Sequence, residues 1–133
     1  MRRLNAFFML AVLFLVSTVS GDDVIPADLA AGRAGEKATV EMHVESSRLL
    51  SDRAEPVCFL NSQKNYRDSR NFTVVIFSKA LKKFAERDIE NPAEFYANKN
   101  LRVTGEIGLR QGSPQMIVEY PGQIEVVEED EKK

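Results

Sequence analysis

Residues 72–84 read Phe72-Thr73-Val74-Val75-Ile76-Phe77-Ser78-Lys79-Ala80-Leu81-Lys82-Lys83-Phe84, and this stretch carries the clearest indication of the fold. Its first six residues are mostly β-branched or aromatic, a composition typical of a strand. Because apolar residues occupy both faces, we expect this strand to lie centrally in a sheet. Ser78 is a suitable N-cap for a helix that continues to about Arg87. Leu81 and Phe84 give that helix its apolar side.

Further strands are predicted on both sides of this stretch. In residues 38–46, apolar Val40, Met42 and Val44 alternate with polar side chains, which is the pattern of a half-buried strand. A polar loop follows over residues 51–55. Three more strands are expected over 56–61, 101–109 and 116–120, with a last extended piece over 124–127.

The connections between these strands carry turn and cap residues. Gly105 lies inside the fourth predicted strand, where a glycine often marks a bulge or a bend. Residues 110–114 read as a hairpin loop. Asn91, Pro92 and Glu94 have the spacing of an N-cap, a first-turn proline and a capping-box partner, so they predict a second short helix. Phe95 and Tyr96 would then pack inward.

This order, β-β-β-α-β-β, predicts an all-β protein with one or two short helices. It is the connectivity of a five-stranded OB-type Greek-key barrel, in which the helix lies between the third and fourth strands. We assign residues 37–127 to this domain, residues 22–36 to a lead-in segment and residues 128–133 to a charged tail. A second domain and an internal repeat are not indicated.

Five segments, taken in order, resemble the OB-fold nucleic-acid-binding superfamily, close to the bacterial tRNA-anticodon-binding-like OB modules. They are Thr39-Val40-Glu41-Met42-His43-Val44, the block from Phe59-Leu60-Asn61 to Phe72-Thr73-Val74-Val75-Ile76, Asn100-Leu101-Arg102-Val103-Thr104-Gly105-Glu106-Ile107, Ser113-Pro114-Gln115-Met116-Ile117-Val118 and Pro121-Gly122-Gln123-Ile124-Glu125-Val126. The resemblance implies a binding surface on the second and third strands and the loops that flank it. It implies the fold more strongly than any activity.

The N-terminus has the composition of a signal peptide. Arg2 and Arg3 precede an uncharged run from Ala6 to Val16, and small residues follow up to Gly21. The apolar run is shorter than the roughly 20 residues that a membrane-spanning helix needs, although an uncleaved anchor is the alternative. We therefore expect cleavage after Ser20 or Gly21, export to the periplasm or the exterior, and no stable membrane span after cleavage.

Charge is distributed unevenly along the chain. The whole sequence has a net charge of −2, and removal of residues 1–21 leaves 16 basic against 20 acidic residues. Residues 46–110 nevertheless hold 12 basic and 8 acidic side chains, whereas the tail is largely acidic. A basic middle permits a polyanionic partner without requiring one.

Catalytic and metal-binding groups are sparse. His43 and Cys58 are the only histidine and cysteine, which excludes an internal disulfide and falls short of the three or four ligands of a zinc site. We expect His43 to be a solvated strand residue and Cys58 a buried, inert thiol. Nucleases with a similar barrel use carboxylates and arginines together, and no such cluster is recognisable here. The sequence thus predicts no enzyme, no cofactor and no metal.

Basic side chains next to an aromatic ring suit single-stranded nucleic acid, because rings stack on bases and cations meet phosphates. Tyr66 lies between Lys64 and Arg67 in this way, although an ordinary solvated loop is the competing interpretation. We expect the aromatic rings of Phe59, Phe72 and Phe77 to fill the barrel. By the resemblance, the candidate ligand-binding residues are Arg48, Arg53, Lys64, Tyr66, Arg67, Arg70 and Arg110.

The sequence therefore favours a noncatalytic exported OB-fold module that binds single-stranded nucleic acid or another polyanion. Intact nucleic acid is scarce outside the cytoplasm, so the alternative is a cell-envelope interaction module that binds a protein, a glycan or a small ligand. The oligomeric state is left open.

Overall fold

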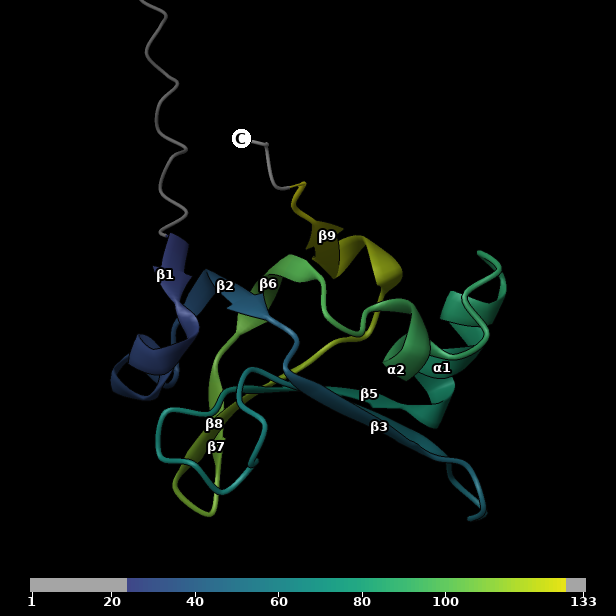
Figure 1. Cartoon of the computed structure of the whole chain (residues 1–133), viewed down its shortest axis with the longest axis horizontal. Helices are drawn as coiled ribbons and strands as arrows, with labels where there is room; N and C mark the ends of the chain where they lie inside the picture. The colour runs from purple at the N-terminus through teal and green to yellow at the C-terminus, as the bar shows by residue number, and fades with distance from the viewer. Residues whose placement is uncertain (1–23, 129–133) are drawn as a thin grey trace, which may run out of the picture.

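The computed structural model describes residues 24–128, which form two β-sheets with short helices beside them (Figure 1). The first sheet, here called sheet A, has the strand order β1-β2-β6-β9, with β1 spanning Val24–Pro26, β2 Lys37–His43, β6 Asn100–Glu106 and β9 Ile124–Val126. The second, sheet B, has the order β3-β4-β5-β8-β7, with β3 spanning Ser46–Leu50, β4 Val57–Asn61, β5 Thr73–Phe77, β7 Gly108–Arg110 and β8 Ser113–Ile117.

Four helical segments complete the described chain. They are the 3₁₀ helix η2 (Ala27–Arg33), the α-helices α1 (Ser78–Ala85) and α2 (Pro92–Phe95), and the short 3₁₀ helix η3 (Pro121–Gln123). The expectation of a mostly β chain with short helices is thus confirmed. None of these helices is long and apolar enough to cross a bilayer. The predicted signal peptide and all of the predicted tail except Glu128 lie outside the described residues.

The single closed barrel expected from the sequence is replaced by two sheets that share two bent segments. Residues 38–46, expected as one strand, divide at Val44 into β2 of sheet A and β3 of sheet B. Residues 101–109 divide in the same way at Ile107, between β6 and β7. Both corner residues are buried, and their amides donate to Lys99 O and Glu36 O at 2.9 Å each. Because these bonds come from other segments, the local pattern did not reveal the bends.

Burial follows the expected strand alternation on one side of each sheet. Leu60, Val74, Ile76 and Met116 of sheet B and Val40 of sheet A belong to one hydrophobic core. The helices α1 and α2 lie together at one end of sheet B (Figure 1). There the Phe84 ring meets the Tyr96 ring edge to face, with centroids 6.3 Å apart.

The helix starts follow the expectation only in part. Asn91 caps α2, accepting a hydrogen bond from Glu94 N at 3.2 Å, and Pro92 is the first helical residue. Ser78, in contrast, is already inside α1, and Phe77 occupies the N-cap position. The Ser78 hydroxyl instead donates to Glu55 Oε1 at 2.5 Å. A carboxylate from the loop between β3 and β4 therefore accepts the hydroxyl proton that was expected to take part in capping.

The β7–β8 hairpin is tighter than expected. Arg110 pairs with Ser113, and the turn residues Gln111 and Gly112 both have positive φ angles, 52° and 85°. This is the signature of a two-residue hairpin turn, and β8 therefore begins at Ser113 rather than at 116. The predicted bulge or bend at Gly105 is wrong, because the β2–β6 register runs through it without interruption. The strand breaks two residues later.

Candidate ligand-binding face of sheet B

One side of sheet B faces away from the core and forms the candidate ligand-binding face. Arg48, Phe59, Val75 and Ile117 are neighbours across β3, β4, β5 and β8 in that order. Because side chains alternate along a strand, all four point to the side opposite the core residues Cys58 and Val74. We call this side of the sheet the outer face.

The outer face is apolar at its centre. Val57 and Val75 are 4% and 3% exposed, yet neither belongs to the hydrophobic core, so the side chains around them on this face cover them. Phe77 and Ile117 are 47% and 44% exposed. Phe77 and Ile117 therefore expose apolar surface on the outer face, and Arg48 lies on the β3 side of that face.

The aromatic residues of the central strands thus divide between the two faces. Phe72 is fully buried in the core, as expected. Phe77 is exposed and Phe59 is half-buried outside the core cluster, so the prediction that both rings fill the barrel is wrong. Strict period-two counting from Val74 and Ile76 would have placed Phe77 on the other face. Composition alone could not separate the two faces of a strand that is apolar on both.

The loop that connects β4 and β5, residues 62–72, borders one end of the outer face and is built around Asn71. This side chain is 2% exposed. Its Oδ1 accepts from Gln63 N at 3.0 Å, and its Nδ2 lies 2.9 Å from Thr73 Oγ1, 3.3 Å from Asn61 Oδ1 and 3.3 Å from Tyr66 O. One buried amide therefore holds both ends and the middle of the loop. Sequence reasoning did not single out Asn71.

Two side-chain turns add order to the same loop. Asn65 Oδ1 accepts from Arg67 N, and Asp68 Oδ1 accepts from Arg70 N, each at 2.9 Å. The Arg70 guanidinium also binds both Asp68 carboxylate oxygens, at 3.1 and 2.8 Å. This hydrogen bonding lowers the pKa of Asp68 to about 2, so the pair stays ionised at any ordinary pH. Arg70 is therefore partly neutralised.

Tyr66 and Arg67 remain available at the surface of this loop. The Tyr66 side chain is 56% exposed, and the Arg67 guanidinium carbon lies 5.1 Å from the centre of its ring. Such a cation–π contact orders both groups without removing them from solvent. Lys64 is exposed beside them. The exposure of Lys64, Tyr66 and Arg67 is what both a binding loop and an ordinary solvated loop require.

The structure brings most of the predicted site residues to one end of sheet B. Strand register places the 62–72 loop and the β7–β8 turn, which follows Arg110, at the end of the sheet where β5 begins (Figure 1). Arg48 lies on the outer face itself. Arg53, in the loop after β3, lies at the opposite end of the sheet and is separated from the others. The residues at the first end are Lys64, Tyr66, Arg67, Arg70 and Arg110.

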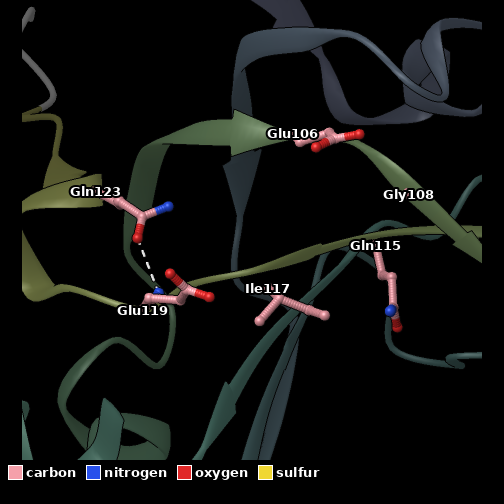
Figure 2. Close-up of a pocket in the computed structure, with 6 residues that line it drawn as sticks. All are labelled: Glu106, Gly108, Gln115, Ile117, Glu119 and Gln123. Atoms are coloured by element: carbon pink, nitrogen blue, oxygen red, sulfur yellow. Dashed lines mark hydrogen bonds between the residues drawn. The ribbon is translucent and has the colours of Figure 1, made fainter.

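A shallow pocket of about 400 Å³ hollows the outer face beside β7 and β8 (Figure 2). Ile117 and Gln115 line it, and Glu106 and Glu119 stand on opposite sides in this view. Gln123 is fixed at its rim, because its side chain accepts from Glu119 N at 2.8 Å and donates to Thr104 O at 2.9 Å. Arg48 thus places a positive charge on the outer face at β3, whereas Glu106 and Glu119 place two negative charges at the pocket. Sequence reasoning did not identify this pocket.

The residues considered for catalysis are separate from this face. Cys58 is fully buried, as expected, and its burial raises the pKa of the thiol to about 12. His43 is half-buried on β2, with Nδ1 2.9 Å from Glu45 Oε2 and Nε2 3.1 Å from Asn98 O. Within residues 24–128, no group of three or more histidine, cysteine or acidic side chains is placed to hold a metal ion.

No family model matches the sequence, and neither does any curated protein. Solved structures that are similar to this chain include a putative aspartyl-tRNA synthetase from Leishmania major Friedlin, with a TM-score of 0.51 and 12% identity. That match covers 92% of this chain and 24% of the other, so this chain spans about a quarter of the synthetase's length.

The second OB-fold domain of replication protein A from Methanococcus maripaludis is also similar, with a TM-score of 0.38 and 10% identity. That match covers 74% of this chain and 91% of the other. At such low identity, structural similarity speaks to the fold alone. The likeness to the synthetase structure therefore concerns the fold of this mostly β chain.

Proposed function

We propose that this chain is a noncatalytic, exported OB-fold module that binds single-stranded nucleic acid or another polyanion. In this proposal the strands follow the Greek-key connectivity of an OB fold, and the two bent segments are its corners. The ligand lies on the outer face of sheet B and reaches the 62–72 loop.

The observation that carries the proposal is the combination of exposed rings with ordered cations. Phe59 and Phe77 present apolar surface on the outer face, and Arg48 borders them. Beyond the end of β4, the Tyr66–Arg67 pair offers a ring and a guanidinium together. Single-stranded nucleic acid binds to such surfaces because every base can stack on a ring while cations follow the backbone.

The binding test is fluorescence anisotropy of the purified protein with a labelled single-stranded oligonucleotide across a salt series. Each phosphate contact on a single strand contributes about −0.7 to the slope of log K against log salt. The double variant Lys64→Ala/Arg67→Ala should therefore reduce the slope by about 1.4. Arg102→Ala is the matched control, because it removes one positive charge from an ion pair with Glu41 on sheet A. If no saturable binding is observed at low salt, the proposal of nucleic-acid binding is refuted.

Export is proposed from residues 1–21 and needs a separate measurement. Mass spectrometry of the protein recovered from cell fractions should find a form that begins after Ser20 or Gly21 outside the cytoplasm. Full-length protein confined to the cytoplasm would contradict export while leaving the binding proposal intact.

The pocket in Figure 2 favours the alternative function, an envelope module that binds a protein, a glycan or a small ligand. Glu106 and Glu119 repel a polyanion, whereas Ile117, which lines the same pocket, suits an apolar group. Glu106→Gln/Glu119→Gln separates the two functions. A polyanion should bind this variant more tightly, whereas capture of an envelope component through the pocket should weaken.

A further inference from the structure

We infer that the lysines of α1, together with Tyr120, form a second contact for the same single-stranded nucleic acid, at the end of the outer face opposite the 62–72 loop. This inference rests on the proposed function and extends it. It assigns a role to a helix and an aromatic residue that were not among the candidate ligand-binding residues.

The lysines gather on the solvent side of a short helix. Ala80 and Phe84 face the core, which leaves Lys79, Lys82 and Lys83 on the other side of α1. Residues three and four apart are neighbours on a helix, so Lys79 adjoins both other lysines. None of the three forms an ion pair with an acidic side chain of residues 24–128. Like charges at this spacing repel, whereas Lys82 and Lys83 in the last turn interact favourably with the helix dipole.

One of these lysines is held against an exposed ring. Lys83 Nζ lies 3.9 Å from the centre of the Tyr120 ring and donates to Glu119 O at 3.3 Å. Tyr120 is nevertheless 56% exposed. The arrangement repeats the Tyr66–Arg67 pair at the other end of the sheet: an open aromatic face with a cation fixed beside it. A ring and cations together are suited to a base and its phosphates.

Helix α1 begins at the end of the outer face. Phe77, which is exposed on that face, is the N-cap of α1, so the helix begins where β5 ends. Tyr120 follows Ile117 and the end of β8, the strand next to β5. The outer face measures about 13 Å from Thr73 to Phe77, four steps of about 3.3 Å. A strand that starts at the 62–72 loop and crosses the outer face therefore arrives at α1.

The experiment compares three forms of the full protein in the same anisotropy assay: wild type, Lys79→Ala/Lys82→Ala and the control Arg102→Ala. OB folds occupy roughly 4–16 nucleotides, so the oligonucleotides are about 4 and about 16 nucleotides long. With the longer one, the α1 variant should lose about 1.4 from the salt slope relative to wild type. With the shorter oligonucleotide, the salt slope of the α1 variant should equal that of Arg102→Ala, because a short strand contacts only the 62–72 loop.

A direct readout accompanies the salt series. A 5-iodouracil-substituted strand of about 16 nucleotides should photo-crosslink to Tyr120, and Tyr120→Ala should remove that crosslinked peptide. Circular dichroism of each variant verifies that α1 remains folded.

The outcomes separate the inference from the proposed function. If wild type does not bind, both fail. If wild type binds and Lys64→Ala/Arg67→Ala weakens binding, but the α1 variant behaves like Arg102→Ala with the longer strand, the inference alone is overturned. It is also overturned if the α1 substitutions weaken binding only to vesicles of anionic phospholipid, which would assign the lysines to a membrane surface.

Discussion

Replacing Asn71 with alanine should destabilise the domain and disorder the loop that carries Tyr66 and Arg67. The buried amide forms about three good hydrogen bonds: it accepts from Gln63 N and donates to Thr73 Oγ1 and to Asn61 Oδ1 or Tyr66 O. Each bond contributes about 0.5–1.5 kcal/mol net, and the partners left buried lose more. We therefore expect the free energy of unfolding to fall by about 2–4 kcal/mol, a large part of the 5–15 kcal/mol typical of a domain.

Urea unfolding followed by tyrosine fluorescence or circular dichroism measures this loss, with Asn65→Ala as the matched control. Asn65 is exposed and accepts one hydrogen bond, from Arg67 N, in the same loop. Loss of this one hydrogen bond should lower the free energy of unfolding by no more than about 1 kcal/mol. Native-state hydrogen exchange should show faster exchange at Gln63 N only in the Asn71 variant. Equal unfolding midpoints for the two variants would refute the view that Asn71 organises the loop.

Three further predictions concern single positions. Since burial raises the pKa of Cys58 to about 12 from an ordinary value near 9, its contribution to stability is complete below pH 9 and lost as pH rises towards 12. The unfolding free energy should therefore fall by up to about 1.4 kcal/mol per pH unit above 9, a slope absent in Cys58→Ala; a shared slope would contradict this. Gly105→Ala places a Cβ 3.0 Å from Met116 Sδ, so it should cost about 1–2 kcal/mol in the same assay, and an unchanged midpoint would show that Met116 moves freely. Asp68→Asn keeps the turn but releases Arg70 from its carboxylate partner, so the salt slope of oligonucleotide binding should steepen by about 0.7, whereas an unchanged slope would place Arg70 away from the strand.

Local patterns were sufficient where a structure depends on nearby residues. The β-branched run at 73–77 is a strand, and the Asn91-Pro92 pair starts a helix with the expected cap. These features depend on residues within four positions of one another, so the sequence displays them directly. The expected strand at 56–61 likewise corresponds to β4 within one residue.

Long-range contacts decided what the sequence did not reveal. Leu109 continues the period-two pattern of β6, yet it is 52% exposed because the chain passes to the other sheet after Ile107. The bend depends on the hydrogen bond from Ile107 N to Glu36 O, between residues 71 positions apart. Phe95 was expected inside with Tyr96 and is 43% exposed instead. Its ring packs on the edge of Tyr96, with centroids 4.8 Å apart, so one aromatic residue covers the other.

The charges of the candidate site can be counted in the sequence, but their arrangement depends on the fold. Counting charges in residues 46–110 identified a basic middle, and the structure divides that charge into separate places. Arg70 is paired with Asp68, whereas Arg53 and the α1 lysines lie at the end of sheet B where β5 ends, with Lys83 beside Tyr120. Excess positive charge alone therefore does not specify a site. The useful criterion is an unpaired cation fixed next to an exposed ring. Within residues 24–128, Arg67 with Tyr66, Lys83 with Tyr120 and Lys99 with Phe95 meet it, and the first two of these pairs lie at the two ends of the outer face.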